Sequence, residues 1–408
     1  KAWQDEVQQE HQSWINMLER RQQPLRVGLV DDNAANGWKS ALEGIFADTP
    51  DAGSVEAPYE IADFKNIDAL ADDIAQRNWD ITCVDLRLTE SDAKTTSRRA
   101  GKLSGTRLVR KLKQIDPSVP VIAFTASNKA WTVQELYEAG ADGYWVKESP
   151  EYGTDPAYTV QNAAALMQTL REVVQRYADA APVWELIKQV QAIRRDPESV
   201  FKFVPLVQDK DEQRVRNHFV SIENRLRRSF GHLVTRPSDH EETAFAFHRK
   251  DRAFLALWGV VNDINELYFD DPKYRGRKLH RTERTERFQF YDPGSESTKE
   301  YWCIESGEAV NEEPPITDSG LAQEIRPRQN GRPKWPTKNV ALPRMQWLLR
   351  RAGSDSLAKR LHVKRGSCLR RLRNDLADIH GETDTVKHAT LEDIRDLARI
   401  WNVILGSV

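Results

Sequence analysis

Cysteine is scarce in this chain of 408 residues. The three cysteines, Cys83, Cys303 and Cys368, lie far apart, and none belongs to a Cys-x-x-Cys or Cys/His pattern. Disulfide frameworks need paired cysteines, and structural zinc sites need closely spaced ligands. The sequence therefore predicts free thiols and no structural zinc.

Long apolar runs are also missing. No run approaches the roughly 18 to 20 apolar residues that a membrane-spanning helix requires. The first residues, KAWQDEVQQEHQSW, are polar, unlike the basic and then apolar start of a signal peptide. We therefore expect a cytoplasmic protein that makes no use of a membrane.

Net charge is nearly absent, at −2, but the average hides an uneven distribution. Residues 341–373 contain ten Lys or Arg side chains and a single acid, Asp355. A local positive field of this size favours a polyanionic partner such as a nucleic acid. A solvated helix face is the alternative explanation.

What the sequence does contain is enough apolar material for real cores, with 39% hydrophobic and 30% charged residues. The length predicts two or three domains. We expect an N-terminal helix (1–24), an α/β domain (25–178), a helical middle region with an irregular Pro/Arg-rich segment (179–337), and a basic helical module (338–408). No repeat of fixed period is present.

Short apolar runs alternate with amphipathic segments between residues 25 and 178, which is typical of a parallel sheet wrapped by helices. The expected strands are Arg26–Val30, Tyr59–Phe64, Ile81–Asp85, Val121–Thr125 and Gly143–Lys147. The expected helices are Gly37–Ala47, Ile67–Arg77, Gly105–Gln114, Thr132–Ala139 and Tyr158–Tyr177.

The remaining chain has mainly helical spacing. In its middle part we expect helices at Trp184–Arg195, Asp209–Phe230 and Lys250–Phe269, and a hairpin of Phe288–Tyr291 with Tyr301–Ile304. Four shorter helices are expected near the C-terminus: Leu342–Arg351, Ser356–Leu361, Gly366–Ile379 and Leu391–Leu405. The second half is therefore predicted to be mainly α-helical, with a small β element.

Polar side chains stand at the carboxyl ends of the predicted strands, where parallel α/β sheets bind their ligands. They are Asp31, Asp32, Asp85, Thr125 and Lys147. At an effective dielectric of about 20, two carboxylates 4 Å apart repel by about 4 kcal/mol, so a cation must accompany the three acids. An oxygen-lined site that also contacts phosphate suits Mg²⁺.

This set of residues predicts phosphoryl chemistry. Asp85 is the candidate nucleophile, which would form an aspartyl-phosphate, and Asp31, Asp32 and Asp85 are the candidate metal ligands. Lys147 would neutralise the phosphoryl oxygens, while the Thr125 hydroxyl would donate a hydrogen bond to one of them.

The motifs VGLVDD, CVDLRL, IAFTAS and GYWVKE resemble the receiver domain of two-component response regulators over about residues 25–178. The resemblance implies a flavodoxin-like fold of five β/α units with strand order 2-1-3-4-5. It also implies that Asp85 accepts the phosphoryl group, that Thr125 and Tyr144 act as a switch pair, and that Lys147 contacts the phosphate. A sensor histidine kinase or phosphotransfer protein would be the donor, and a homodimer is expected.

Two features depart from that pattern. Glu148, not the usual proline, follows Lys147. The loop after Asp85 is long and basic, with Arg87, Lys94, Arg98, Arg99 and Lys102. It could contact a partner or restrict the phosphodonor, and a solvated loop is the alternative.

We expect the basic C-terminal module to carry the effector function that phosphorylation of such a domain controls. The segment Ser356–Arg373 has the pattern of a helix-turn-helix DNA reader, whose second helix would enter the major groove. Lys364 and Arg365 would then hold phosphates, and base edges would be read from Ser367, Arg370, Arg371 and Arg373. His362 replaces the usual turn glycine, and Arg371 stands where an apolar residue is expected.

A second pattern overlaps the first. Arg373 and His380 are separated by six residues, which resembles the R-x4-6-H signature of HEPN ribonucleases. By that resemblance His380 would shuttle protons and Arg373 would stabilise the transition state of RNA cleavage. A protein-interaction scaffold is the third possibility for this region.

Overall fold

The computed structural model describes residues 2–34, 38–60, 62–89, 92, 100–125, 130–147, 156–196, 212–235, 244–269, 277–281, 286–291, 299–303, 308–310, 345, 348–349, 352–361, 368–377 and 388–406. The chain divides into two compact units, Lys1–Asp179 and Ala180–Val408. No helix among these residues is long and apolar enough to cross a membrane.

The first unit is built on a parallel sheet with strand order β2-β1-β3-β4-β5. The strands are β1 (Leu25–Val30), β2 (Gly53–Glu56), β3 (Ile81–Asp85), β4 (Val121–Thr125) and β5 (Gly143–Val146). β3 and β4 are buried along their whole length, because helices cover both faces of the sheet. The predicted flavodoxin-like fold is confirmed.

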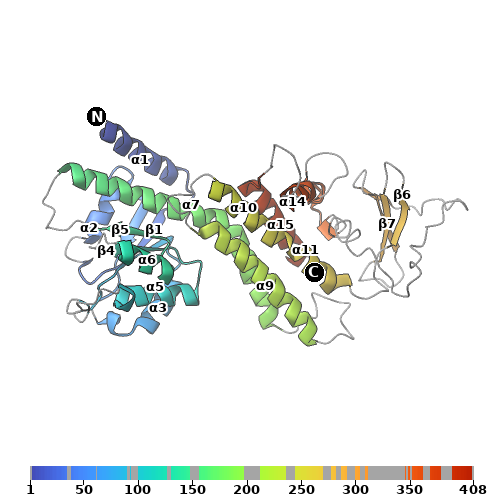
Figure 1. Ribbon diagram of the computed structural model, residues 1–408, viewed down its shortest axis with the longest axis horizontal. Helices are drawn as coiled ribbons and strands as arrows, with labels where there is room; N and C mark the ends of the chain where they lie inside the picture. Colours follow the sequence, from blue (N-terminus) through green and yellow to red (C-terminus); the bar gives the residue numbers. More distant parts are fainter. Residues whose placement is uncertain are drawn as a thin grey trace, which may run out of the picture. The chain divides into compact units, whose positions relative to one another are not determined.

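Helices cover the sheet on two sides (Figure 1). α3 (Ile67–Gln76), α5 (Ser104–Ile115) and α6 (Ala130–Ala139) lie on one side, and the N-terminal part of α7 (Pro156–Arg195) lies on the other. α2 (Trp38–Glu43) follows β1 and continues into the 3₁₀ turn η2 (Gly44–Phe46).

The strand predicted at Tyr59–Phe64 is wrong, since β2 lies earlier in the chain. Phe64 belongs to the 3₁₀ turn η4 (Asp63–Lys65) and packs into the core from there. The Tyr59 hydroxyl donates to Asp73 at 2.8 Å, and the Tyr59 ring stands edge-on to Trp79. These aromatic side chains pack in or against the core although they lie outside any strand. Their apolar pattern in the sequence therefore predicted a strand that the described residues do not form.

The leading helix, α1 (Ala2–Glu19), packs on the first unit. Trp14 is fully buried, contacts Phe46 and donates from its indole nitrogen to the Ile45 carbonyl at 2.9 Å. Glu10 accepts two hydrogen bonds from Arg171 of α7, at 2.8 and 2.9 Å. The helix is therefore fastened to its own chain.

α7 is one helix of 40 residues, where the sequence predicted two with a break between them. Pro182 lies inside it, and the division between the two units falls just before this proline. An internal proline removes a backbone hydrogen bond and costs about 3 kcal/mol. Full burial of Ala180, Val183 and Ile187 offsets this cost and keeps the helix continuous.

The second unit is mainly helical, as predicted, with a small antiparallel sheet. Its helices are the C-terminal part of α7, α9 (Glu212–Val234), α10 (Ala244–Trp258), α11 (Val260–Phe269), α13 (Asp355–Leu361), α14 (Leu369–Ala377) and α15 (Leu391–Gly406). Its sheet has the order β6 (Arg277–Arg281), β7 (Glu286–Tyr291), β8 (Lys299–Cys303) and β9 (Glu308–Val310).

Two predictions in this unit have clear outcomes. The hairpin is confirmed, since β7 pairs with β8 and Phe288 lies opposite Trp302. The single helix predicted at Lys250–Phe269 is instead two, because the chain turns at Gly259 between α10 and α11. The helix predicted at Leu342–Arg351 lies largely outside the described residues.

α15 is fastened to α10. The Trp401 indole nitrogen donates to the Leu257 carbonyl at 3.1 Å, and the Ala389 N–H donates to Asp251 at 2.7 Å. His388 also contacts the Asp251 carboxylate at 2.8 Å. The last part of the C-terminal module thus packs directly on a helix of the middle region.

Candidate functional site

Three carboxylates meet at the carboxyl end of the sheet. Asp31 and Asp32 directly follow β1, and Asp85 is the last residue of β3, the neighbouring strand. An oxygen from each of the three lies within 4.8 Å of the others. Asp31 and Asp85 are buried, and Asp32 is half-buried.

The Lys147 ammonium lies between two of these acids. Its Nζ is 2.5 Å from Asp31 Oδ2 and 2.9 Å from Asp85 Oδ1, and it also lies 4.9 Å from the centre of the Trp38 ring. The backbone N–H of Lys147 donates a hydrogen bond to the Thr125 carbonyl at 2.7 Å. This bond holds Lys147 at the end of β5. One buried ammonium group therefore forms ion pairs with two buried carboxylates.

The electrostatics of the cluster favour further positive charge. Burial raises the pKa of Asp85, and Lys147 opposes this effect only in part. Burial and the neighbouring Asp31 charge also raise the pKa of Asp32. Three hard carboxylate oxygens so close together form a donor set that fits Mg²⁺.

The backbone around Asp85 is held closely. The Arg87 N–H donates to Asp85 Oδ2 at 3.1 Å, and the Gly105 N–H at the start of α5 donates to the Leu86 carbonyl at 3.1 Å. A Cβ at Gly105 would come within 2.0 Å of the Asp85 carbonyl oxygen. Only glycine allows α5 to approach the end of β3 this closely.

The predicted switch residues lie on the two neighbouring strands. Thr125 ends β4, is 2% exposed, and lies opposite Val146 in the register with β5. Tyr144 lies in β5, is partly buried against the core, and stands edge-on to Tyr137 of α6 with 6.0 Å between ring centres. Thr125 thus lies at the carboxyl edge of the sheet, as Asp85 does, whereas Tyr144 lies beside α6.

Sequence reasoning missed a buried carboxylate in the loop after β3. Asp92 accepts hydrogen bonds from the Thr89 hydroxyl at 3.0 Å and from the Ser104 N–H at 3.2 Å, and it also accepts from the Ser104 hydroxyl. Ser104 in turn accepts from the Leu88 N–H at 3.1 Å. No spacing rule links Asp92 to Ser104, twelve residues away, so this pair could not be recognised from the sequence.

The C-terminal candidates are not brought together within the described residues. Lys364, Arg365, Ser367 and His380 lie outside them. Arg370, Arg371 and Arg373 lie on α14. Arg373 is exposed and donates to Asn374 at 3.2 Å, so neither a DNA-reading surface nor an Arg/His pair is defined here.

Comparison with known proteins gives one family match, to the response regulator receiver domain over residues 54–152. No curated protein matches the chain.

Solved structures with similarity include a LuxR-family two-component response regulator from Aurantimonas sp. SI85-9A1, 25% identical over 36% of this chain and 86% of that one, with a TM-score of 0.25. A CheY-like receiver domain protein from Methanospirillum hungatei JF-1 is 16% identical over 36% and 98%, with a TM-score of 0.24. The Salmonella typhimurium response regulator RcsB is 12% identical over 55% and 99%, with a TM-score of 0.23.

The family match and the strand order agree. Residues 54–152 run from β2 past β5, and the five strands have the 2-1-3-4-5 order that the motifs implied. The β/α unit of this chain is a receiver domain of the two-component response regulators, and a mostly helical C-terminal region follows it.

Proposed function

We propose that this protein is a response regulator of a phosphorelay that accepts a phosphoryl group on Asp85. The observation that carries the proposal is the meeting of Asp31, Asp32 and Asp85 around the Lys147 ammonium. Burying carboxylates so close together costs free energy unless positive charge binds beside them. A phosphoryl group accompanied by a cation meets that requirement.

The donor would be a phosphohistidine on a sensor histidine kinase or phosphotransfer protein. An Asp85 carboxylate oxygen attacks phosphorus, the P–N bond breaks, and the imidazole leaves with the electron pair. The Lys147 ammonium moves part of its contact from the Asp85 carboxylate to a phosphoryl oxygen. The Thr125 hydroxyl donates a hydrogen bond to another phosphoryl oxygen. Mg²⁺, held by the three aspartates, would supply charge neutralisation.

The same event would alter the face formed by α6 and β5. Phosphorylation adds about −1.5 to −2 charge at one end of the sheet. Thr125 moves toward that charge, and the space it leaves changes the packing of Tyr144 against Tyr137 of α6. Tyr144 thereby reports the state of Asp85 to a partner surface.

Binding of beryllofluoride, a phosphoryl mimic, with Mg²⁺ tests the acceptor. Trp38 contacts Lys147, so tryptophan fluorescence should change on binding and give a saturable titration. Asp85→Asn should abolish the signal, whereas Asp72→Asn, an exposed carboxylate on α3, should leave it intact. Binding that survives Asp85→Asn would sink the acceptor role.

For the output, we propose binding of nucleic acid by the C-terminal region, with a helix-turn-helix reader of DNA as the leading form. The ten basic residues of 341–373 support it, as do the helices α13 and α14 in that part of the chain. Tight binding to one promoter fragment with a steep dependence on salt is the expected result. Binding that ignores DNA sequence would argue against a reader.

The alternative output, a HEPN-like ribonuclease, rests on Arg373 and His380. It predicts degradation of RNA without added metal, and loss of this activity in His380→Ala while the fold is retained. Unchanged RNA in a prolonged incubation, with or without beryllofluoride, would exclude it. A protein-interaction scaffold would show neither RNA cleavage nor nucleic-acid binding.

A further inference from the structure

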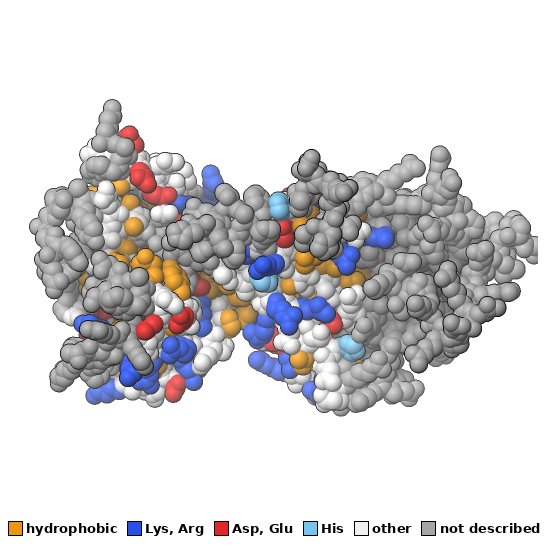
Figure 2. All heavy atoms as spheres, in the orientation of Figure 1, with side chains coloured by type: hydrophobic (Ala, Val, Ile, Leu, Met, Phe, Trp, Pro, Cys, Tyr) orange, Lys and Arg blue, Asp and Glu red, His pale blue; other side chains and the backbone are white. Residues whose placement is uncertain are grey.

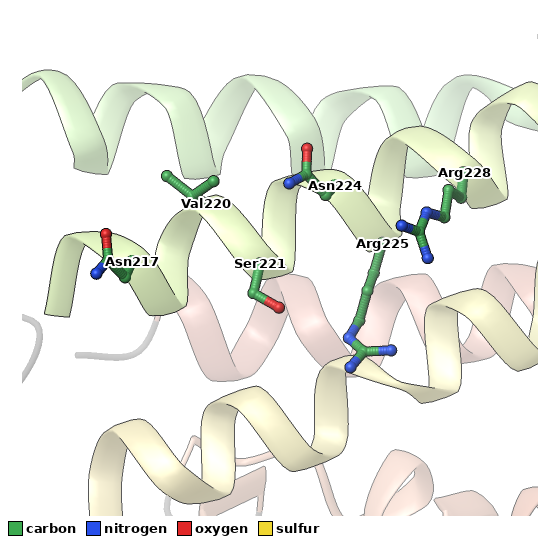
Figure 3. A pocket seen from close by; sticks show the side chains of 6 residues that line it. All are labelled: Asn217, Val220, Ser221, Asn224, Arg225 and Arg228. Atoms are coloured by element: carbon green, nitrogen blue, oxygen red, sulfur yellow. The ribbon is translucent and has the colours of Figure 1, made fainter. Parts of the chain in front are cut away.

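The second unit carries a polar groove on α9. Its volume is about 410 Å³, and its described lining residues are Asn217, Val220, Ser221, Asn224, Arg225 and Arg228. All six come from successive turns of this one helix (Figure 3). Residues spaced three and four apart share a helix face, so this sequence presents a continuous stripe to the groove.

The stripe has the chemistry of an anion site. Its side chains supply amide and guanidinium donors, and no carboxylate is among the described lining residues. α9 as a whole has five arginines against two glutamates. In the view of Figure 2, Lys and Arg side chains gather over part of the second unit. The local field therefore favours a negatively charged ligand.

Part of the stripe is held in place from the neighbouring helix. Asp263 of α11 accepts from the Ser221 hydroxyl at 3.0 Å and from Arg225 Nε at 2.6 Å. Gly259, at the turn before α11, leaves room for this arginine, since a Cβ there would lie 2.5 Å from Arg225 Nη1. The Arg225 guanidinium is thus oriented before any ligand arrives.

Arg228 differs from Arg225 in being exposed and in having no ion pair with a described residue. Its charge is available to a ligand in the groove. A fixed guanidinium and an exposed one, on neighbouring turns beside two amides, suit a ligand with repeated anionic groups. Phosphate contacts in nucleic-acid complexes come from these side-chain types.

We propose that the α9 groove binds the phosphodiester backbone of a nucleic acid. The proposal rests on the nucleic-acid output given above and extends it to the middle region of the chain. From Asn217 to Arg228 the helix rises about 16 Å, enough to follow several phosphates of one strand. A protein partner is disfavoured because Val220 is the one apolar side chain among the described lining residues, and protein interfaces centre on apolar and aromatic contacts.

The test uses the full chain and fluorescence anisotropy with two probes, a mixed-sequence DNA duplex and a single-stranded RNA. Arg228→Glu should weaken binding of the probe that the wild type prefers by about tenfold and lower the salt slope by about 0.9 or more. Asn217→Ala combined with Asn224→Ala should weaken it less. Lys188→Ala, which removes an exposed cation from α7 in the same unit, should leave affinity within twofold.

The outcomes separate the groove from the general output. If the wild type binds but Arg228→Glu binds equally well, the groove proposal falls and nucleic-acid binding stands. If the wild type binds neither probe, the proposed output falls and takes the groove with it. Equal competition by polyglutamate at matched charge would reassign the groove to an acidic protein partner and overturn the proposal.

Discussion

At the site, the Lys147 ammonium bridges two buried carboxylates, and its removal would leave both with uncompensated charge. Loss of one partner from a buried ion pair costs about 3 to 5 kcal/mol. Lys147→Met keeps most of the aliphatic stem, so we expect a loss of about 3 kcal/mol in the free energy of unfolding, measured by urea denaturation without divalent ions.

Added Mg²⁺ should restore part of the stability of Lys147→Met, because the same oxygens would then face a cation. Lys39→Met is the matched control, since Lys39 is exposed on α2 and pairs loosely with Glu43 at 3.6 Å. Its effect should stay within about 0.5 kcal/mol. Equal stability losses in the two variants would contradict the buried role of Lys147.

Gly105 sets how closely α5 can approach the phosphoacceptor strand. Gly105→Ala places a methyl group against the Asp85 carbonyl, and we expect a loss of about 1 to 3 kcal/mol in unfolding free energy. Beryllofluoride affinity should fall as well, because the Asp85 backbone must shift. Gly44→Ala, whose new methyl group would meet nothing within 4 Å, serves as the control and should change neither measurement.

At the scale of elements, Glu223 fastens α9 to the end of α7. It accepts from Gln191 at 2.9 Å and Arg227 at 2.9 Å, and it also pairs with Arg194. Burial raises the pKa of Glu223, but the hydrogen bonds from Gln191, Arg227 and Arg194 outweigh burial, so the pKa lies below its ordinary 4.5. The stabilisation is therefore complete above about pH 4.5 and is lost as the pH falls through the lowered folded-state pKa.

Glu223→Gln should consequently destabilise the protein by about 1 to 2 kcal/mol at pH 7. The difference from wild type should shrink as the pH is lowered below 4.5, because the carboxylate of the unfolded wild type takes up a proton there before the folded one does. Urea denaturation followed by circular dichroism at pH 7 and pH 4 measures both values. A difference that grows on acidification would contradict this assignment.

At the scale of the whole molecule, we expect phosphorylation to favour the homodimer that the resemblance to response regulators implies. Phosphorylation drives dimerisation only if it stabilises the conformation whose surface pairs. A free-energy difference of about 5.5 kcal/mol between the two conformations moves their populations from 1:99 to 99:1. We expect beryllofluoride with Mg²⁺ to double the mass measured by light scattering after gel filtration. Asp85→Asn should keep one mass in both conditions, and an unchanged wild-type mass would count against the homodimer.

The sequence by itself determined the receiver fold and the members of the acidic cluster. Buried parallel strands are short apolar runs, and the polar residue that ends each run must lie at one edge of the sheet. This geometry made Asp31, Asp85, Thr125 and Lys147 recognisable without coordinates. The mainly helical second half and its hairpin were also predictable, since helical spacing and strand alternation are local properties.

Only the tertiary structure decided the features that depend on distant partners. Tyr59 and Phe64 fill the core from a loop, α7 continues through Pro182 because its neighbours are buried, and Asp92 reaches Ser104 across the loop after β3. In the α9 groove, Arg225 is oriented by Asp263 of another helix. Local spacing reports which side chains need burial, whereas the chain topology chooses the partner that each one meets.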